Sequence, residues 1–250
     1  VPKNYKDASP FQFQKSDVVS IIGNGLGDRM QHAGWTETLI QSALPQHQLS
    51  FRNMAVTGDR ANNYPRSRGF TPMAEYLQHV KADVVIAMFG YNESFDKSPA
   101  DYQKELTRLV NDVRRAQPNG ATFPRIVLCS PIAHENLKDP NLPNGRANNK
   151  RLLAITEATR LAAKDNGVAF LDLFNPSIEL YASHDEPLTL NGIHLNAAGH
   201  QAIGEIISSA LVGQKITASP KNEKLRSAVL DKNWHWHNRY RATDGNDVWG

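Results

Sequence analysis

The sequence predicts an α/β protein, a three-layer α/β/α sandwich with a five-stranded parallel sheet between two layers of helices. Five short apolar segments of strand length alternate with longer segments in which apolar residues recur at helical spacing. The short segments are apolar along most of their length, as parallel strands are when helices cover both faces of a sheet. Strands joined through helices form right-handed crossovers, so the connections indicate a doubly wound sheet.

The predicted elements follow one another in regular order along the chain. The five strands are predicted at residues 17–22, 49–53, 83–89, 125–129 and 168–173. The five helices between and after them are predicted at residues 26–43, 71–80, 99–116, 147–166 and 197–211. Glycines at 120, 167 and 213 stand near the ends of three helices, where glycine is a common stop signal because it accepts a left-handed backbone.

The two ends of the chain fall outside this alternation. Residues 1–15 are polar and aperiodic and are predicted to form an N-terminal arm packed on the surface of a domain that spans residues 16–212. Residues 213–250 are predicted to be a C-terminal extension or a linker into a neighbouring domain after residue 250. A C-terminal flap whose aromatic rings cover the site is the alternative. For Trp234 and Trp236, stacking on sugar rings and an ordinary packing anchor are the two interpretations. The start, without an initiator Met or a signal peptide, indicates an excised domain or a processed chain.

Composition and charge exclude several classes of protein. The chain is 40% hydrophobic and 21% charged, which is ordinary for a globular domain. A net charge of +3 is compatible with an acidic substrate but is too small and too scattered for nucleic-acid binding. The single cysteine, Cys129, excludes an internal disulfide and a cysteine metal site, and His235 and His237 lack partners at metal-ligand spacing. The sequence therefore predicts no metal, no cofactor and, without a long apolar run, no membrane span.

Polar segments follow the predicted strands at the points where a parallel sheet gathers its functional loops. Ligands bind outside the carboxyl ends of the strands in such a sheet, close to helix N-termini. The segments at residues 23–30, 53–60, 90–94, 130–136 and 191–196 read GNGLGDRM, NMAVTGDR, GYNES, SPIAHEN and NGIHLN. We therefore expect the site to be built from these segments.

In order and spacing, these segments resemble those of the SGNH hydrolases, also called GDSL-like esterases and lipases. In that family the first loop reads Gly-Asp-Ser-Leu with a serine nucleophile, and the last carries an Asp-x-x-His pair. The resemblance covers residues 16–212 and implies the SGNH hydrolase fold, a flavodoxin-like sheet. It implies that Gly58 and Asn92 are oxyanion-hole donors and that His194 is the catalytic base.

Three positions depart from the family pattern. Gly25 stands where the serine is expected, Asn24 replaces the aspartate before it, and Asn191 replaces the aspartate that orients the histidine. A serine esterase needs an attacking oxygen, a base and an acid that stabilises the imidazolium. Because glycine has no nucleophile and asparagine has no charge, the substitutions remove the covalent route.

The remaining groups form a pocket rich in hydrogen-bond donors. Backbone N–H groups at the helix start and the Asn92 amide would converge with His194, and Arg29 would add a charge suited to carboxylate, sulfate or phosphate. Nearby carboxylates could serve as acid and base in glycoside hydrolysis or activate water, although Asp28 also suits a helix cap. The predicted catalytic residues are His194, Asn92, Gly58 and Glu93. The predicted substrate-binding residues are Gly25, Asn24, Arg29, Asp28, His134, Glu135 and Asn191.

These residues predict an SGNH-fold hydrolase that acts on an ester or glycosidic bond of a carbohydrate by water activation. Many relatives remove acetyl groups or other decorations from polysaccharides, and the chain looks like a bacterial subgroup with a small residue at the serine position. One alternative is an inactive module that binds a glycan or an oxyanion, and another is an esterase that uses the hydroxyl of Thr57 or Ser94. The expected partner is a carbohydrate or another small, acidic molecule, and the family implies secretion or a periplasmic location.

Overall fold

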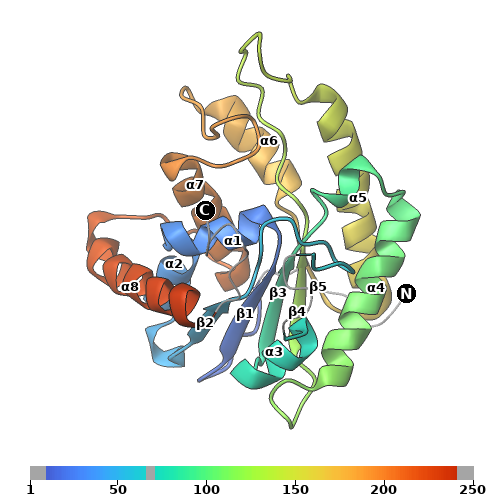
Figure 1. The fold of residues 1–250 in the computed structure, drawn as a ribbon. Helices are drawn as coiled ribbons and strands as arrows, with labels where there is room; N and C mark the ends of the chain where they lie inside the picture. Colours follow the sequence, from blue (N-terminus) through green and yellow to red (C-terminus); the bar gives the residue numbers. More distant parts are fainter. Residues whose placement is uncertain (1–9, 66–70, 241–250) are drawn as a thin grey trace.

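The computed structural model describes residues 10–65 and 71–240 and has the predicted three-layer sandwich (Figure 1). Its sheet consists of five parallel strands in the order β2-β1-β3-β4-β5. The strands are β1 (Val18–Gly23), β2 (Ser50–Asn53), β3 (Val84–Met88), β4 (Arg125–Cys129) and β5 (Ala169–Leu171). The order reverses between β1 and β3, which makes the sheet doubly wound and opens a crevice at the carboxyl ends of these strands.

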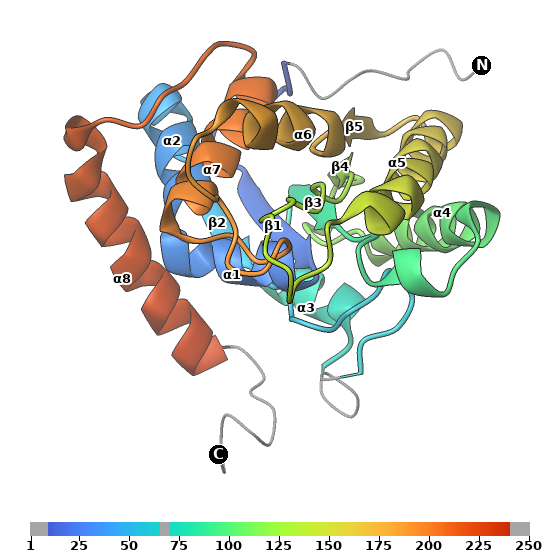
Figure 2. The ribbon, with the colours of Figure 1, turned by 90° about the horizontal axis from the view of Figure 1, so that it is seen from above.

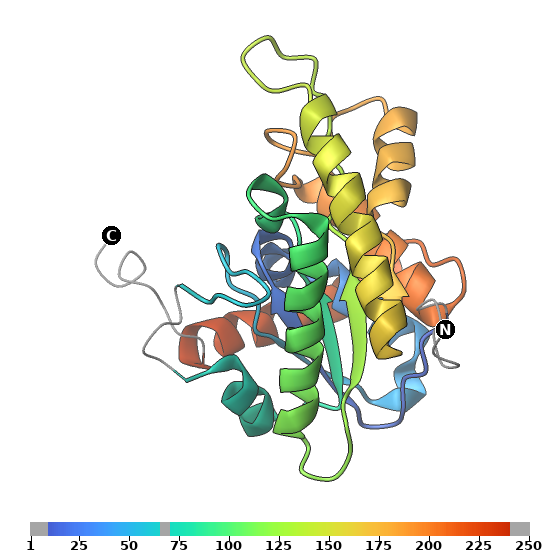
Figure 3. The ribbon, with the colours of Figure 1, turned by 90° about the vertical axis from the view of Figure 1, so that its right-hand side faces the viewer.

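Helices cover both faces of the sheet (Figure 2). One face packs on α1 (Gly25–Ala33), α2 (Trp35–Ala43), α6 (Phe174–Ser183) and α7 (Ala197–Val212). The other packs on α3 (Met73–Val80), α4 (Pro99–Ala116) and α5 (Arg146–Asn166), of which α4 and α5 lie side by side in Figure 3. In β3 and the residue that follows it, residues 84, 86 and 88 face the first layer and residues 85, 87 and 89 the second, because side chains alternate along a strand.

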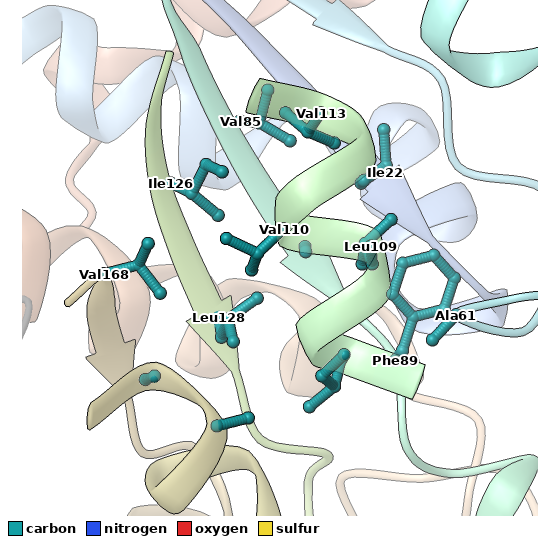
Figure 4. Close-up of a cluster of buried hydrophobic side chains, with 14 of the residues drawn as sticks. Ile22, Ala61, Val85, Phe89, Leu109, Val110, Val113, Ile126, Leu128 and Val168 are labelled. Atoms are coloured by element: carbon teal, nitrogen blue, oxygen red, sulfur yellow. The ribbon is translucent and has the colours of Figure 1, made fainter. Parts of the chain in front are cut away.

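The second layer contains a continuous apolar core. Leu109, Val110 and Val113 of α4 lie against Val85, Ile126 and Leu128 of the sheet (Figure 4). All six are almost completely buried. Burial of this kind contributes roughly 25 cal/mol for each Å² of apolar surface removed from water, so the core holds the strand ends in place for the loops that follow them.

The predicted helix at residues 26–43 is wrong as a single element. It is divided at Gly34, whose φ of 72° places it in the left-handed region and whose N–H donates to Met30 O. A Cβ at this position would lie 3.1 Å from Leu230, so glycine also allows another helix to approach. The remaining predicted helices are present, and the strand boundaries lie within two residues of the predictions.

That other helix is α8 (Glu223–Tyr240), which the sequence pattern did not predict and which follows the short turn η3 (Pro220–Asn222). It packs on α1, α2 and β2. The Trp236 indole N–H donates to Asn53 O at 2.7 Å, and Lys232 forms an ion pair with Glu37 at 2.6 Å. Trp234 is 63% exposed on the opposite side. Residues 223–240 are therefore a helix packed on the domain, with the Trp236 ring in the contact.

The N-terminal arm is described only from residue 10. There, the Phe11 N–H donates to Leu211 O at 2.7 Å, and the Phe13 ring is buried in the core beside α7. Residues 1–9 of the predicted arm and residues 241–250 of the extension lie outside the described residues. Two further short turns, η1 (Pro45–His47) and η2 (Glu93–Phe95), complete the elements.

Candidate functional site

A pocket of about 200 Å³ opens at the carboxyl ends of β1, β3 and β4, where α1 begins. Five loops, α1 and α7 contribute to its walls, as expected for a parallel sheet. Its apolar wall includes Leu26, Met88, Phe89, Ile132, Ile193 and Leu195. Its polar wall includes six of the predicted site residues, which are Asn24, Gly25, Arg29, Gly58, Asn92 and His194. The lining contains no aspartate or glutamate among the described residues.

His194 reaches the pocket from the loop before α7 and is held by Asn191. Asn191 Oδ1 accepts the backbone N–H of His194 at 3.0 Å, which fixes the amide. Both Asn191 Oδ1 and Nδ2 lie 3.1 Å from His194 Nδ1, so the neutral ring has a partner in either tautomer. Burial, followed by the charge of Arg29, lowers the pKa of His194 from its ordinary value of 6.5. The imidazole is therefore neutral at pH 7 and suited to accept a proton.

Hydrogen-bond donors surround the same space. Gly58 lines the pocket in a loop where its φ of 96° favours glycine. One hydrogen of the Asn92 amide donates to Asp59 O at 3.1 Å, which holds the side chain and leaves its second hydrogen for a ligand. α1 has no side-chain cap at Asn24, so the N–H groups of its first turn remain donors at the pocket. This arrangement can stabilise an oxyanion.

The position of the expected serine is open space. A Cβ at Gly25 would meet only the Thr57 side chain, at 3.8 Å and 4.0 Å, which is ordinary contact. Gly25 is also absent from the residues with positive φ. Neither the backbone nor the packing therefore requires glycine here. Asn24, which is 3% exposed, lines the pocket beside it, and its amide nitrogen has no hydrogen-bond partner among the described residues.

Arg29 and His200 give the pocket its electrostatic character. Arg29 lies on α1, and its charge lowers the pKa of both His194 and His200. Burial is the main cause for His200, whose pKa falls to about 4. His200 was not predicted, although a histidine in the first turn of the helix that follows His194 is a signal that could have identified it. Tyr91, which precedes Asn92 in the predicted loop, was also missed.

Glu93 is a correction to the predicted catalytic set. Its side chain is completely buried, does not line the pocket, and accepts the N–H groups of Gly90 at 3.0 Å and Ala61 at 2.8 Å. Burial is the main cause that raises the pKa of its carboxyl. Glu93 therefore joins the loops that carry Gly58 and Asn92, with its carboxylate bonded to backbone N–H groups outside the pocket lining.

Asp28 is also turned away from the pocket. One carboxylate oxygen accepts the Thr57 hydroxyl at 2.7 Å and the Thr57 N–H at 3.0 Å, and the other accepts the Gln31 amide. The predicted substrate contact is corrected to a bond between α1 and the loop after β2.

His134, Glu135 and Asn191 form a layer behind the pocket wall. Glu135 accepts the N–H groups of Leu188 and Thr189 and the Thr189 hydroxyl, which anchors the loop that carries His194. His134 is buried, with Nδ1 at 3.2 Å from the Asn148 amide. None of the three lines the pocket, so the predicted substrate contacts become structural supports.

The alternative nucleophiles differ in position. Ser94 is buried outside the pocket and donates to Tyr91 O at 2.7 Å. Ser130 lines the pocket, but its hydroxyl accepts the N–H groups of Leu173 and Phe174 at the start of α6. Thr57 lines the pocket with its hydroxyl beside the Gly25 space.

In residues 10–65 and 71–240, no group of three or more His, Cys, Asp or Glu side chains is placed to hold a metal ion. Within the same ranges, no helix has the length and apolarity needed to cross a membrane. The pocket, with its neutral histidines and its donors, is therefore the candidate site that we consider.

The comparisons with known proteins agree with this fold. A sequence model described as the GDSL-like lipase/acylhydrolase family matches residues 20–202. No curated protein sequence matches the chain.

Among solved structures, the chain is similar to a catalytic mutant of an acetylxylan esterase from Geobacillus stearothermophilus, with 16% identity, 82% and 98% of the two chains covered, and a TM-score of 0.62. It is similar to an α/β hydrolase from the metagenome of Lake Arreo, Spain, with 20% identity, 80% and 98% coverage, and a TM-score of 0.59. A carbohydrate acetylesterase from Sinorhizobium meliloti has 15% identity, 78% and 97% coverage, and a TM-score of 0.55.

Proposed function

This chain belongs to the GDSL-like lipase/acylhydrolase family, and we propose that it hydrolyses an acyl ester on a carbohydrate by activating water in place of a serine. The observation that carries the proposal is the pairing of an empty serine position at Gly25 with a neutral His194 in the same pocket. His194 and the donors of the expected oxyanion hole keep their places, while Gly25 replaces the covalent nucleophile and Asn191 replaces the aspartate that orients the histidine.

The proposed reaction has two steps. In the tautomer in which His194 Nδ1–H donates to Asn191 Oδ1, Nε2 carries the lone pair and takes a proton from water as the water oxygen bonds to the ester carbon. The oxyanion is stabilised by N–H groups of Gly25 and Gly58 and by the Asn92 amide. The bond to the sugar oxygen then breaks, and the imidazolium returns its proton to that oxygen.

Several features support an ester over a glycosidic bond. Glycosidases use two carboxylates that flank the scissile bond, and no carboxylate lines this pocket within the described residues. A space of about 200 Å³ with one apolar wall suits a small acyl group such as acetyl. The similar proteins of Geobacillus and Sinorhizobium are described as an acetylxylan esterase and a carbohydrate acetylesterase, and we extend this substrate class to the present chain. Arg29 would favour an acidic sugar.

The test is a turnover screen of the purified chain against acetylated xylo-oligosaccharides, acetylated uronate oligomers and p-nitrophenyl esters and glycosides. We expect cleavage of one ester class, with kcat reduced about 100-fold or more in His194→Ala because the base is lost. His235→Ala, on the exposed side of α8, is the matched control. Equal turnover by the two variants would exclude His194 as the base.

A binding module remains the second candidate, favoured by the Asn24 amide, which has no partner within the described residues, and by the uncharged Asn191. In this case the screen shows no turnover, while calorimetry detects binding of the oligosaccharide that His194→Ala weakens.

A further inference from the structure

We infer that the space beside Gly25 holds the attacking water molecule and that Thr57 positions it. The inference rests on the proposed function and adds to it a site for the nucleophile and a role for a residue to which the resemblance gives none. Two independent observations carry it, one about space and one about the direction of hydrogen bonds.

The first observation is that Gly25 leaves room that the fold does not need. A Cβ would meet only Thr57 Oγ1 at 3.8 Å and Thr57 Cγ2 at 4.0 Å, and the φ angle of Gly25 is not positive. By contrast, a Cβ at Gly27, two residues further along α1, would lie 2.9 Å from Ala55 Cβ, so packing requires glycine there. The free volume at Gly25 lies in the wall of the pocket that also contains His194.

The second observation is that Thr57 presents an acceptor to this volume. Its hydroxyl donates to Asp28 Oδ2 at 2.7 Å, and the same oxygen accepts the Thr57 N–H at 3.0 Å. A hydroxyl that has given its only hydrogen to a carboxylate offers lone pairs to any other neighbour. Asp28 therefore fixes the direction of the Thr57 hydroxyl, which explains why this carboxylate points away from the pocket.

Together, these groups orient a water molecule. Water between Thr57 Oγ1 and His194 Nε2 donates one hydrogen to each, and its lone pair is then directed at the ester carbon held by the oxyanion donors. When the oxygen bonds to carbon, the hydrogen on the His194 side moves to Nε2, and the electron pair of the carbonyl bond moves to the oxyanion. The hydrogen on the Thr57 side stays with the new carboxylic acid, so Thr57 is a positioning residue and forms no bond to carbon.

Four variants test this assignment on the ester that the screen identifies. Gly25→Ala fills the space with a methyl group, and Thr57→Val removes the acceptor at nearly constant shape. We expect each to lower kcat about 100-fold, with KM changed by less than about threefold, because substrate binding does not use the water. Thr57→Ser, which keeps the hydroxyl, should recover most of the loss. Thr217→Val, at an exposed position, is the matched control.

Gly25→Ser supplies a readout that does not depend on native turnover. The introduced hydroxyl would lie in the same space beside His194, and we expect a fluorophosphonate probe to label it covalently, while the unaltered chain stays unlabelled. Thermal unfolding of every variant shows whether a loss of activity reflects a loss of folding.

The outcomes separate the inference from the proposed function. Full activity in Gly25→Ala or Thr57→Val, with esterase activity in the unaltered chain, would overturn the water site and leave the function intact. An acyl group found on Thr57 by peptide mass spectrometry would also overturn it, because Thr57 would then be a nucleophile. Absence of turnover in the unaltered chain on every ester would overturn both.

Discussion

The replacement of a carboxylate by Asn191 determines how strong a base His194 can be. A carboxylate beside Nδ1 would stabilise the imidazolium, whereas the Asn191 amide at 3.1 Å orients the ring without a charge. Burial and the charge of Arg29 then lower the pKa of His194. Activity therefore depends on an unprotonated ring and should rise with pH through a pKa below 6.5.

Asn191→Asp should reverse this effect. The new carboxylate favours the protonated ring, so the pKa of His194 rises, and the acid limb of the kcat/KM profile moves to higher pH. The plateau rate should also rise, because the imidazolium formed during attack is stabilised. The measurement is the pH profile on the preferred ester, with Asn136→Asp, on an exposed loop, as the control. An unchanged acid limb would mean that His194 does not set the profile.

Glu93 supports the site through two backbone N–H groups, and its substitution tests this structural role. In the unaltered chain, the Glu93 carboxylate accepts the N–H groups of Gly90 and Ala61. Glu93→Gln leaves one acceptor oxygen and places an amide NH₂ group against one of these two donors. We expect a loss of about 1 to 3 kcal/mol in the free energy of unfolding, measured in urea. Glu157→Gln, on the exposed face of α5, should cost less than about 0.5 kcal/mol. A loss of activity at full stability would restore the catalytic role.

At the scale of elements, α8 is held mainly by one of its two tryptophans. Trp236 is 9% exposed and donates to Asn53 at the end of β2, whereas Trp234 is 63% exposed. Trp236→Ala should lower the free energy of unfolding by about 3 to 5 kcal/mol, and Trp234→Ala by less than about 0.5 kcal/mol. Chemical denaturation of both variants gives the comparison. Similar losses would show that α8 is not anchored in this way.

All strands except β2 (Ser50–Asn53) are apolar along most of their length, which made the sheet predictable, but two helices were not predictable. α6 begins three residues after the end of β5 and its N-cap residue is the apolar Leu173, so the start of this helix was read as part of the strand predicted at residues 168–173. α8 has few buried apolar side chains, Val229 and Trp236 among them, which gives little helical periodicity. The break at Gly34 was missed because a glycine within a helical pattern is also compatible with an unbroken helix.

At the scale of the whole molecule, the sequence predicted which strand-end loops line the pocket. It did not predict which carboxylates point into the pocket and which bond to the backbone. Gly58, Asn92 and His194 meet because the parallel strands bring their loops to one edge. The sequence does not record whether a carboxylate faces solvent or accepts backbone N–H groups, and Glu93 and Glu135 do the latter. The space beside Gly25 could not be predicted either, because it depends on the distance to Thr57 in another loop.

His200 couples the pocket to the stability of the whole fold. Its pKa is about 4 in the folded chain against an ordinary 6.5, so only the unfolded chain binds its proton between these values. Stability should therefore fall as the pH drops from about 6.5 to about 4, by on the order of 2 kcal/mol from this partly exposed ring. Thermal unfolding across this range should show a smaller decrease in His200→Asn than in the unaltered chain. An equal decrease in both would assign the effect to other groups.

The most direct test of hydrolysis without a serine is a rapid-mixing measurement of the two products, the free sugar and the acid, during the first turnover of the ester. A single attack by water releases both at the same rate without an initial burst, and His194→Ala should abolish both. A burst of free sugar ahead of the acid would reveal an acyl-enzyme and would contradict the proposed reaction.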